Sequence, residues 1–348
     1  MKIVVFETEP WERPTFDTVA DEEGHQLVFV DGPLTEENAP EHGDAEVVST
    51  FIYSELGADV LAELPHLRMI STRSTGFDHI DGEYCREHDI VVSNVPVYGA
   101  NTVAEHVFAL LLALSHHIVD AVDRTRRGDF SLQGLRGFDL QGKTLGIVGT
   151  GDIGLHTIRI ARGFRMEVVA YDVDPKPELA EELGFRYASL DDVLKESDVL
   201  SLHVPLNEST RHMIGDGEFA RMKDGAVLIN TARGDVVDVD ALVRALHEGK
   251  VAAAGLDVLP MEPVIREEAE LLRSIFHEKH DLETLLMDHI LLRLRNVIIT
   301  PHSAFDTREA VQRILDTTVE NIEAFLDGRP QNVVLGPGAE PEASGGRA

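Results

Sequence analysis

The sequence predicts an α/β protein made of two doubly wound domains, each built around a parallel sheet. Short apolar runs alternate with polar, helix-length stretches along most of the chain. This alternation is typical of parallel strands joined by crossover helices. The chain has 348 residues, of which 43% are apolar and 27% are charged. A chain of this length and composition can form two hydrophobic cores.

The predicted strands fall into two series. In the first, between residue 2 and about residue 95, the clearest apolar runs are residues 3–6, 26–30 and 68–72. The second series has six predicted strands, which are residues 142–148, 168–171, 199–202, 226–229, 252–256 and 297–299. Among the segments between them, residues 240–247 have helical periodicity that ends before Gly249, a natural helix terminator.

Three further segments have helical periodicity. Residues 103–114 are apolar almost all round except for Glu105 and His106, so we expect a buried helix between domains or subunits. Residues 307–326 form an amphipathic helical pattern. The stretch from Glu262 to Asn296 has helical spacing that is too regular for a plain loop.

The charge balance disfavours two classes of partner. The formal net charge is −31, from 62 acidic and 31 basic residues, so nucleic-acid phosphates and anionic membrane surfaces would be repelled. The acidic residues are scattered along the chain, which predicts a solvated acidic surface suited to a salt-rich cytosol, as in halophilic organisms.

Location and metal content also follow from composition. No apolar run approaches the ~20 residues of a membrane span, and no secretory leader precedes the first strand, so we expect a cytoplasmic protein. The one cysteine, Cys85, can form no intramolecular disulfide and has no neighbours suited to a zinc site. We therefore expect Cys85 to pack in a core, and we expect no metal.

A glycine-rich loop predicts the cofactor site. Gly149-Thr150-Gly151-Asp152-Ile153-Gly154 follows a predicted strand and opens a helix, as the dinucleotide fingerprint requires. Gly149 permits the tight turn, Gly151 lets the backbone approach a pyrophosphate, and Gly154 allows close helix packing. The amino terminus of the helix then provides N–H groups and a positive dipole for the phosphates.

Asp172 indicates which dinucleotide binds. It ends the next strand, where a carboxylate accepts hydrogen bonds from the adenosine ribose hydroxyls and repels a 2′-phosphate. No arginine follows it to reverse that preference, so NAD is favoured over NADP. The alternative is that Asp172 only caps a turn with Asp174 and Pro175.

Four ionisable residues, Arg233, Asp257, Glu262 and His302, follow predicted strands of the second series. Ligands bind in the crevice at the carboxyl ends of such strands, so these side chains can meet there. Hydride transfer to a carbonyl needs a cation for the substrate carboxylate, which suits Arg233. It also needs an acid for the developing alkoxide, which suits His302. A carboxylate such as Glu262 beside the imidazole would raise the pKa of His302.

With these motifs, residues from about Ile70 to about Phe325 resemble the D-isomer-specific 2-hydroxyacid dehydrogenase family. The stretches that carry the resemblance are residues 74–81, 95–106, the glycine loop, 203–206, 230–234, 255–258 and 301–302. The resemblance implies a Rossmann NAD-binding domain inserted into a discontinuous, flavodoxin-like substrate domain. It places the substrate domain at residues 1–100 and 303–335 and the NAD domain at 101–302. The composition of the last residues separately predicts a disordered tail at 336–348. It also implies a homodimer in which the helix near 103–114 takes part.

The resemblance also implies residue roles. The family's catalytic arginine, glutamate and histidine fall on Arg233, Glu262 and His302, and Asp257 falls on the aspartate that supports the site near the nicotinamide. Ser74, Thr75 and Gly76 match the loop that binds the substrate carboxylate. Further positions implied to contact the cofactor are Gly149, Gly151, Asp152, Ile153, Gly154, Asp172, Val204, Pro205, Thr231, Ala232, Arg233, Asp257 and His302. In addition to Arg233, the resemblance implies that Tyr53, Tyr98 and Phe305 line the substrate pocket.

Several functions stay open on the same machinery. The sequence around His302 and the long segment after Glu262 resemble the D-lactate dehydrogenase branch, so D-lactate and pyruvate or a related 2-oxo acid are the expected substrates. Glyoxylate or hydroxypyruvate reductase and phosphoglycerate or phosphite dehydrogenase are alternatives, whereas formate dehydrogenase would need glutamine at position 262. In a different class, the chain could be a corepressor-like protein in which NAD(H) controls partner binding; the Arg233, Glu262 and His302 set argues against it.

Overall fold

The computed structural model describes residues 1–21, 24–260, 287, 290–337 and 339. The chain divides into two compact units. We call residues 1–98 with 307–348 the terminal unit and residues 99–306 the central unit. In the ranges that the structure describes, no single helix is both long and apolar enough to cross a membrane.

The terminal unit is built around a six-stranded sheet with the order β13-β5-β4-β3-β1-β2. Its strands are β1 (Lys2–Val5), β2 (Gln26–Phe29), β3 (Val47–Thr50), β4 (Met69–Thr72), β5 (Val91–Ser93) and β13 (Val333–Leu335). All neighbours pair in parallel except β13, which pairs antiparallel with β5. Strands β3 and β4 are buried along their whole length, as expected for strands covered on both faces.

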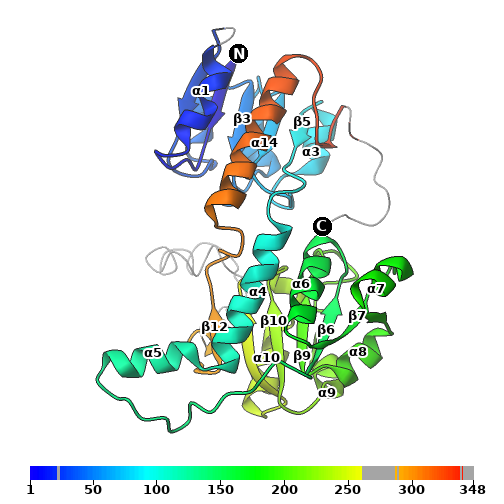
Figure 1. Cartoon of the computed structure of the whole chain (residues 1–348). Coiled ribbons are helices and arrows are strands. Elements are labelled where there is room, and N and C mark those ends of the chain that lie inside the picture. Colours follow the sequence, from blue (N-terminus) through cyan, green and yellow to red (C-terminus); the bar gives the residue numbers. More distant parts are fainter. Residues whose placement is uncertain (22–23, 261–286, 288–289, 338, 340–348) are drawn as a thin grey trace. The chain divides into compact units, whose positions relative to one another are not determined.

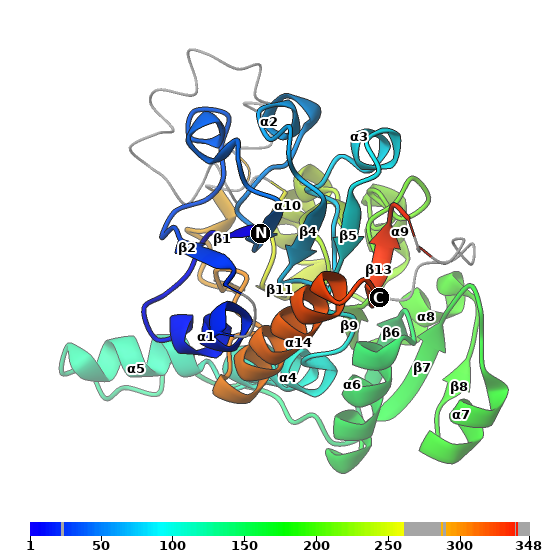
Figure 2. The same ribbon diagram turned by 90° about the horizontal axis from the view of Figure 1, so that it is seen from above.

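Helices cover both faces of this sheet. They are α1 (Arg13–Asp21), α2 (Ala58–Ala62), α3 (Gly82–Glu87), α14 (Arg308–Leu326) and the 3₁₀ turn η1 (Ala39–His42). Helices α1 and α14 lie side by side on one face, and α2 and α3 lie on the other (Figure 2). Cys85 on α3 is fully buried in the core, so its predicted packing role is confirmed.

The central unit has a seven-stranded, fully parallel sheet with the order β12-β11-β10-β9-β6-β7-β8. Its strands are β6 (Thr144–Val148), β7 (Glu167–Tyr171), β8 (Arg186–Tyr187), β9 (Val199–Leu202), β10 (Ala226–Asn230), β11 (Val251–Leu256) and β12 (Val297–Ile299). The strand order reverses between β6 and β9, which places a topological switch point beside the carboxyl end of β6.

Two layers of helix cover the central sheet (Figure 1). The described helices are α4 (Ala100–Ser115), α5 (Ile118–Arg126), α6 (Asp152–Gly163), α7 (Pro177–Leu183), α8 (Leu190–Glu196), α9 (Asp216–Arg221), α10 (Val239–His247) and the 3₁₀ turn η2 (Gly234–Val236). One core joins α4 and α6 to the sheet through Leu111, Ile147 and Ile158. The other joins α8, α9 and α10 to it through residues such as Phe219 and Leu242.

The predicted fold of two parallel-sheet α/β domains is confirmed, with local corrections. All six strands predicted in the second series are present, but a seventh, β8, was missed because two residues are too few to show a periodicity. The sheet of the terminal unit is not purely parallel, because β13 closes its edge antiparallel. The predicted helix in 262–296 and most of the predicted tail lie outside the described residues.

Candidate active site

The glycine loop connects β6 to α6 at the switch point, and its geometry requires glycine. Gly149 has φ +97°, and a Cβ there would lie 2.5 Å from the carbonyl oxygen of His203. A Cβ on Gly154 would lie 2.2 Å from the carbonyl oxygen of Gly149. Gly151 is the N-cap of α6 and has no side chain to cap the N–H groups of the first turn. The loop therefore offers a close backbone approach and a helix dipole to an anion.

Asp172 follows β7 and is held beside this loop. Its Oδ2 accepts hydrogen bonds from the backbone N–H of Thr150 at 2.6 Å and from the Thr150 hydroxyl at 2.8 Å. The same hydroxyl lies 2.9 Å from the phenol of Tyr187 on β8. Burial alone would raise the pKa of Asp172, but hydrogen bonds from Asp174 and Thr150 keep it below its usual value. Asp172 is therefore ionised at neutral pH.

The predicted alternative role of Asp172 as a turn cap is also present, since Oδ1 accepts the N–H of Asp174 at 2.9 Å. The two roles are compatible, because a carboxylate has about four acceptor positions and three are used. A second feature lies directly after β10, where the buried hydroxyl of Thr231 has no hydrogen-bond partner among the described residues. Both features fit a dinucleotide that brings hydroxyl and amide groups to this edge of the sheet.

Arg233 lies in the loop after β10, and Asn230 fixes that loop. The Asn230 side chain donates to the Arg233 carbonyl at 2.9 Å and accepts the N–H of Ala232 at 3.0 Å. A Cβ on Gly234 would lie 2.2 Å from the carbonyl carbon of Leu259, so this loop packs directly on the backbone that follows β11. The two loops enclose a pocket of about 180 Å³ lined by Leu206, Arg233, Gly234, Asp235, Val258, Leu259, Pro260 and His302.

His302 reaches the same pocket from the turn after β12. It has a left-handed backbone with φ 52°, and its N–H donates to the carbonyl of Asp257 at 2.9 Å. The Asp257 carboxylate, 1% exposed, accepts the N–H groups of Ser303 at 3.0 Å and Ala304 at 2.9 Å. His203, which follows β9, is neutral at neutral pH, because burial lowers its pKa to about 3.

Asp257 is the centre of a buried network. Besides the two amides, its Oδ1 accepts the hydroxyl of Thr300 and lies 3.4 Å from Nε2 of His106. Burial would raise the pKa of Asp257, but the hydrogen bonds from His106, Thr300, Ala304 and Ser303 together lower it. The carboxylate therefore stays charged at neutral pH.

The other positions predicted in the central unit are distributed along the same edge of the sheet. Those at the start of α6 and after β9 and β10 are Ile153, Val204, Pro205, Thr231 and Ala232. Phe305 is half-buried in the turn that follows His302. Glu262, the predicted carboxylate partner of His302, lies outside the described residues.

The predicted substrate loop, Ser74 to Gly76, lies in the terminal unit directly after β4. The Ser74 hydroxyl donates to the Gly76 carbonyl at 2.6 Å, and the Thr75 hydroxyl donates to the Val95 carbonyl at 2.8 Å. The Asn94 amide also donates to the Thr75 carbonyl at 2.7 Å. The loop is thus fixed by its neighbours after β5, which is a requirement for a preorganised carboxylate site.

A buried clamp that the sequence did not indicate ties together three loops of the terminal unit. The Glu7 carboxylate accepts the N–H groups of Phe51 and Tyr53. Arg73 is 3% exposed and donates to the carbonyls of Phe6 and Glu7, at 2.7 Å each. Because Arg73 precedes the substrate loop, the clamp connects that loop to the segment that carries Tyr53.

The two tyrosines predicted for the pocket differ in exposure. Tyr53 is 48% exposed, and its ring contacts that of Phe51 edge-on, with centroids 5.7 Å apart. Tyr98 is half-buried at the end of the first segment of the terminal unit, and its carbonyl accepts a hydrogen bond from Arg313 on α14.

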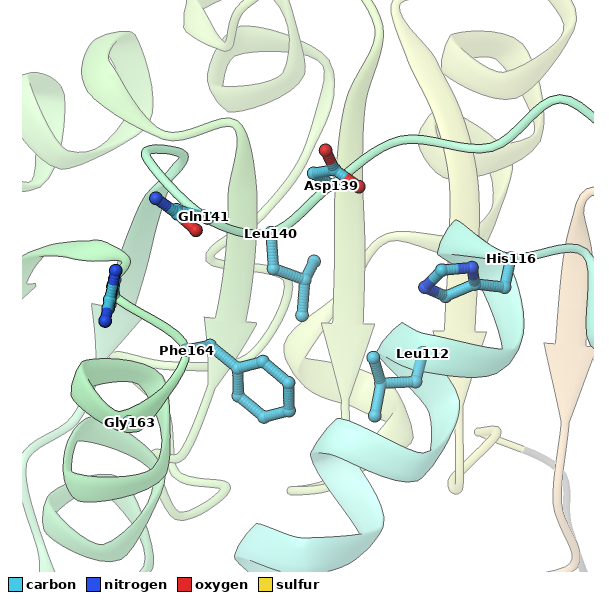
Figure 3. Close-up of a pocket in the computed structure, with 8 residues that line it drawn as sticks. Leu112, His116, Asp139, Leu140, Gln141, Gly163 and Phe164 are labelled. Atoms are coloured by element: carbon cyan, nitrogen blue, oxygen red, sulfur yellow. The ribbon is translucent and has the colours of Figure 1, made fainter.

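A larger cavity of about 430 Å³ lies elsewhere in the central unit (Figure 3). It is lined by Leu112, His116, Asp139, Leu140, Gln141, Gly163, Phe164 and Arg165. These residues lie at or just after the carboxyl ends of α4 and α6, or precede β6, so the cavity lies at the amino edge of the sheet. Ligands of doubly wound sheets bind at the opposite, carboxyl edge, which favours the smaller pocket as the active site.

The fold and the glycine loop define a dinucleotide-binding α/β protein. Comparison with known proteins agrees, because residues 108–304 match the model of the D-isomer specific 2-hydroxyacid dehydrogenase NAD binding domain. The D-lactate dehydrogenase of Escherichia coli is 36% identical over 334 residues, which cover 94% of this chain and 98% of that protein. The glyoxylate reductase of Thermococcus litoralis is 38% identical over 299 residues, which cover 84% of each protein.

Among solved structures, that of D-lactate dehydrogenase from Aquifex aeolicus complexed with NAD and lactic acid has a TM-score of 0.85 and 37% identity, and the match covers 96% of this chain and 99% of that one. The chain therefore belongs to the D-isomer-specific 2-hydroxyacid dehydrogenase family. It is an NAD-dependent oxidoreductase, which confirms the predicted family, enzyme class and cofactor.

Proposed function

We propose that the chain is a D-lactate dehydrogenase that reduces pyruvate, or a related small 2-oxo acid, with NADH. The observation that carries this proposal is the single pocket lined by both Arg233 and His302, which brings a permanent cation and a titratable acid to one carbonyl. The substrate assignment is supported by the Escherichia coli enzyme, which matches over 98% of its length, and by the Aquifex aeolicus structure with lactic acid.

In the proposed mechanism, bound NADH supplies the hydride. Arg233 binds the substrate carboxylate and polarises its carbonyl, because its planar fork of N–H donors matches both oxygens. His302 donates a proton to the developing alkoxide and accepts it again in the reverse direction. Glu262 is proposed to pair with the imidazole and favour its charged form. Ser74, Thr75 and Gly76 are proposed to bind the substrate carboxylate through backbone N–H groups.

The cofactor residues have proposed roles as well. The N–H groups at the start of α6 would bind the pyrophosphate, with Gly149, Gly151 and Gly154 allowing its approach. Asp172 would accept a ribose hydroxyl at Oδ1. Along the rest of the carboxyl edge, the proposed contacts are Asp152, Ile153, Val204, Pro205, Thr231, Ala232 and Asp257. Tyr53, Tyr98 and Phe305 are proposed to line the substrate side chain.

The first experiment is NADH oxidation with pyruvate, glyoxylate, hydroxypyruvate and 2-oxoisocaproate, measured at low and at molar salt with NADPH as control. We expect NADH-dependent turnover with the highest kcat/KM for pyruvate. A clear preference for glyoxylate would favour the second candidate, glyoxylate reductase, which the Thermococcus litoralis relative at 38% identity supports. NADH binding without turnover on any substrate would favour the NAD(H)-sensing, corepressor-like function instead.

The proposed roles of Arg233 and His302 predict distinct losses. His302→Ala should lower kcat at least about 100-fold, the usual contribution of a general acid. Arg233→Ala should weaken transition-state binding by about 2 to 4 kcal/mol, measured as kcat/KM. Arg244→Ala is the matched control, because this arginine pairs only with Asp216 on the exposed surface among the contacts that the structure gives. Wild-type rates in either active-site variant would remove that residue from the mechanism.

We also propose that the chain forms a homodimer through the region of α4 and α5. Helix α5 and the segment after it extend away from the other helices of the central unit (Figure 1). They expose large apolar side chains, which are Ile118, Val119, Val122, Phe130 and Leu132. Such a surface is costly for a monomer and typical of an interface. Sedimentation should give a dimer, and Phe130→Asp with Leu132→Asp should shift it toward monomer.

The predicted cytoplasmic location stays a prediction.

A further inference from the structure

One polar side chain of helix α4 extends the hydrogen-bond network of the active-site turn. His106 lies on the mostly apolar helix α4, and its Nε2 is 2.9 Å from the hydroxyl of Thr300. The Thr300 hydroxyl in turn donates to Oδ1 of Asp257. The two ends of this contact are 194 residues apart in the chain, so the fold itself brings them together.

The chemistry of the three groups fixes the direction of the network. A hydroxyl has one proton, and Thr300 gives it to Asp257, whose ionised carboxylate can only accept. The Thr300 oxygen must therefore accept from His106, which means that Nε2 of His106 carries a proton. His106 thus donates to Thr300, and Thr300 donates to Asp257, so that each bond polarises the next. Nε2 of His106 also lies 3.4 Å from Oδ1 of Asp257, so His106 contacts the carboxylate directly as well.

Asp257 also binds the backbone of the turn that carries His302, the proposed acid. Its two carboxylate oxygens hold the N–H groups of Ser303 and Ala304, and its backbone carbonyl holds the N–H of His302. His302 needs such support because its left-handed backbone, φ 52°, is unfavourable for a residue with a Cβ. Without a partner for Thr300, the carboxylate would be freer to rotate and the turn less strictly held.

We propose that His106 and Thr300 are positioning residues, which act through Asp257 to hold the His302 turn in its catalytic conformation. This inference rests on the proposed role of His302 in hydride transfer. Neither residue touches the reacting atoms in this scheme. Their contribution is orientation, and a small displacement of a catalytic group can cost about 100-fold in rate.

The test compares disruptive and conservative variants at both positions. Thr300→Val removes only the hydroxyl, and His106→Leu removes the donor, whereas Thr300→Ser and His106→Gln keep a hydroxyl and an N–H donor. Three quantities are measured for each full-length variant: amide hydrogen exchange at residues 302–304, the dissociation constant for NADH, and kcat and KM for the 2-oxo acid that wild type reduces best.

We expect Thr300→Val and His106→Leu to increase exchange at Ser303 and Ala304 and to lower kcat about 10- to about 100-fold. NADH affinity should change by less than about threefold, and the conservative variants should retain most of kcat. The double variant should lose less than the two single losses combined, because both residues act on the same carboxylate and their effects are not additive. A merely structural role would instead lower thermal stability in all variants without this separation of kcat from NADH affinity.

Two results would overturn the proposal: unchanged exchange at Ser303 and Ala304 in both disruptive variants, or an unchanged kcat in an active enzyme. Failure of the proposed function gives a different pattern. If wild type binds NADH but reduces no 2-oxo acid, while the disruptive variants still increase exchange in the turn, the network holds the turn as inferred and the assigned reaction is wrong.

Discussion

At the scale of single residues, we propose that Asp172 decides which dinucleotide the chain accepts. Removing its carboxylate in Asp172→Ala should weaken NADH binding about 10- to about 100-fold, since hydrogen bonds to a charged group contribute about 1.5 to 3 kcal/mol. Binding of NADPH should weaken less or improve, because the repulsion of a 2′-phosphate disappears. The ratio of the two dissociation constants, measured by cofactor fluorescence, checks the expectation.

Tyr187→Phe provides the control for Asp172. It removes only the phenol that lies 2.9 Å from the Thr150 hydroxyl and leaves the charge of Asp172 in place, so the NADH to NADPH ratio should stay near wild type. An Asp172→Ala variant that keeps the wild-type ratio would show that Asp172 acts only as the cap of the Asp174 turn.

The sequence indicated candidate site residues but not the residues that contact them. Asp172 and His302 were singled out because each follows a strand in a pattern with a chemical meaning. Thr150 was part of the quoted motif without a role, and His106 was noted only as a polar exception in an apolar helix. Their roles depend on contacts between distant segments, such as His106 with Thr300, and no local pattern in a single sequence encodes such a contact.

At the scale of elements, the loop between β6 and α6 requires glycine at position 149, whereas the far end of α6 does not require it at position 163. Gly149→Ala would place a Cβ 2.5 Å from the His203 carbonyl oxygen at a backbone of φ +97°. We expect it to abolish measurable NADH binding and to reduce the free energy of unfolding by more than about 1 kcal/mol. A fluorescence titration and a denaturant melt measure the two effects.

Gly163→Ala is the matched control at the other end of the same helix. A Cβ at Gly163 meets nothing within 4 Å, and alanine favours helix over glycine by about 1 kcal/mol. This variant should bind NADH like wild type with equal or higher stability. If Gly149→Ala behaved like Gly163→Ala, the loop would not be the cofactor site.

Element boundaries show where periodicity is informative. The amphipathic pattern over 307–326 became α14, Arg308–Leu326, and the apolar stretch over 103–114 became α4, Ala100–Ser115. Both helices are long enough for a period of 3.6 to repeat. By contrast, β8 has two residues and β13 has three. Their pairing comes from the sheet edges that they meet, since so few residues carry no pattern of their own.

At the scale of the whole molecule, electrostatics sets two opposing terms. The formal net charge of −31 makes like charges repel over the surface, which destabilises the compact state. Against this, the described residues form exposed ion pairs such as Arg244 with Asp216 and Lys195 with Asp191. Exposed pairs contribute about 0 to 1 kcal/mol each. Salt screens both terms, so it weakens the pairs and relieves the repulsion.

The excess of acidic residues predicts which term wins. Because there are 62 acidic residues and only 31 lysines and arginines, many acidic groups have no cationic partner of their own. These groups repel one another until salt screens them. The thermal midpoint should therefore rise as potassium chloride increases from about 0.05 M to about 3 M, as the Debye length falls toward ~3 Å and below.

Stabilisation by ion exclusion would be larger for sulfate than for chloride at equal ionic strength, so equal gains in the thermal midpoint with both anions indicate screening. A midpoint that falls with salt would mean that the ion pairs dominate, and it would remove the basis for a salt-rich habitat.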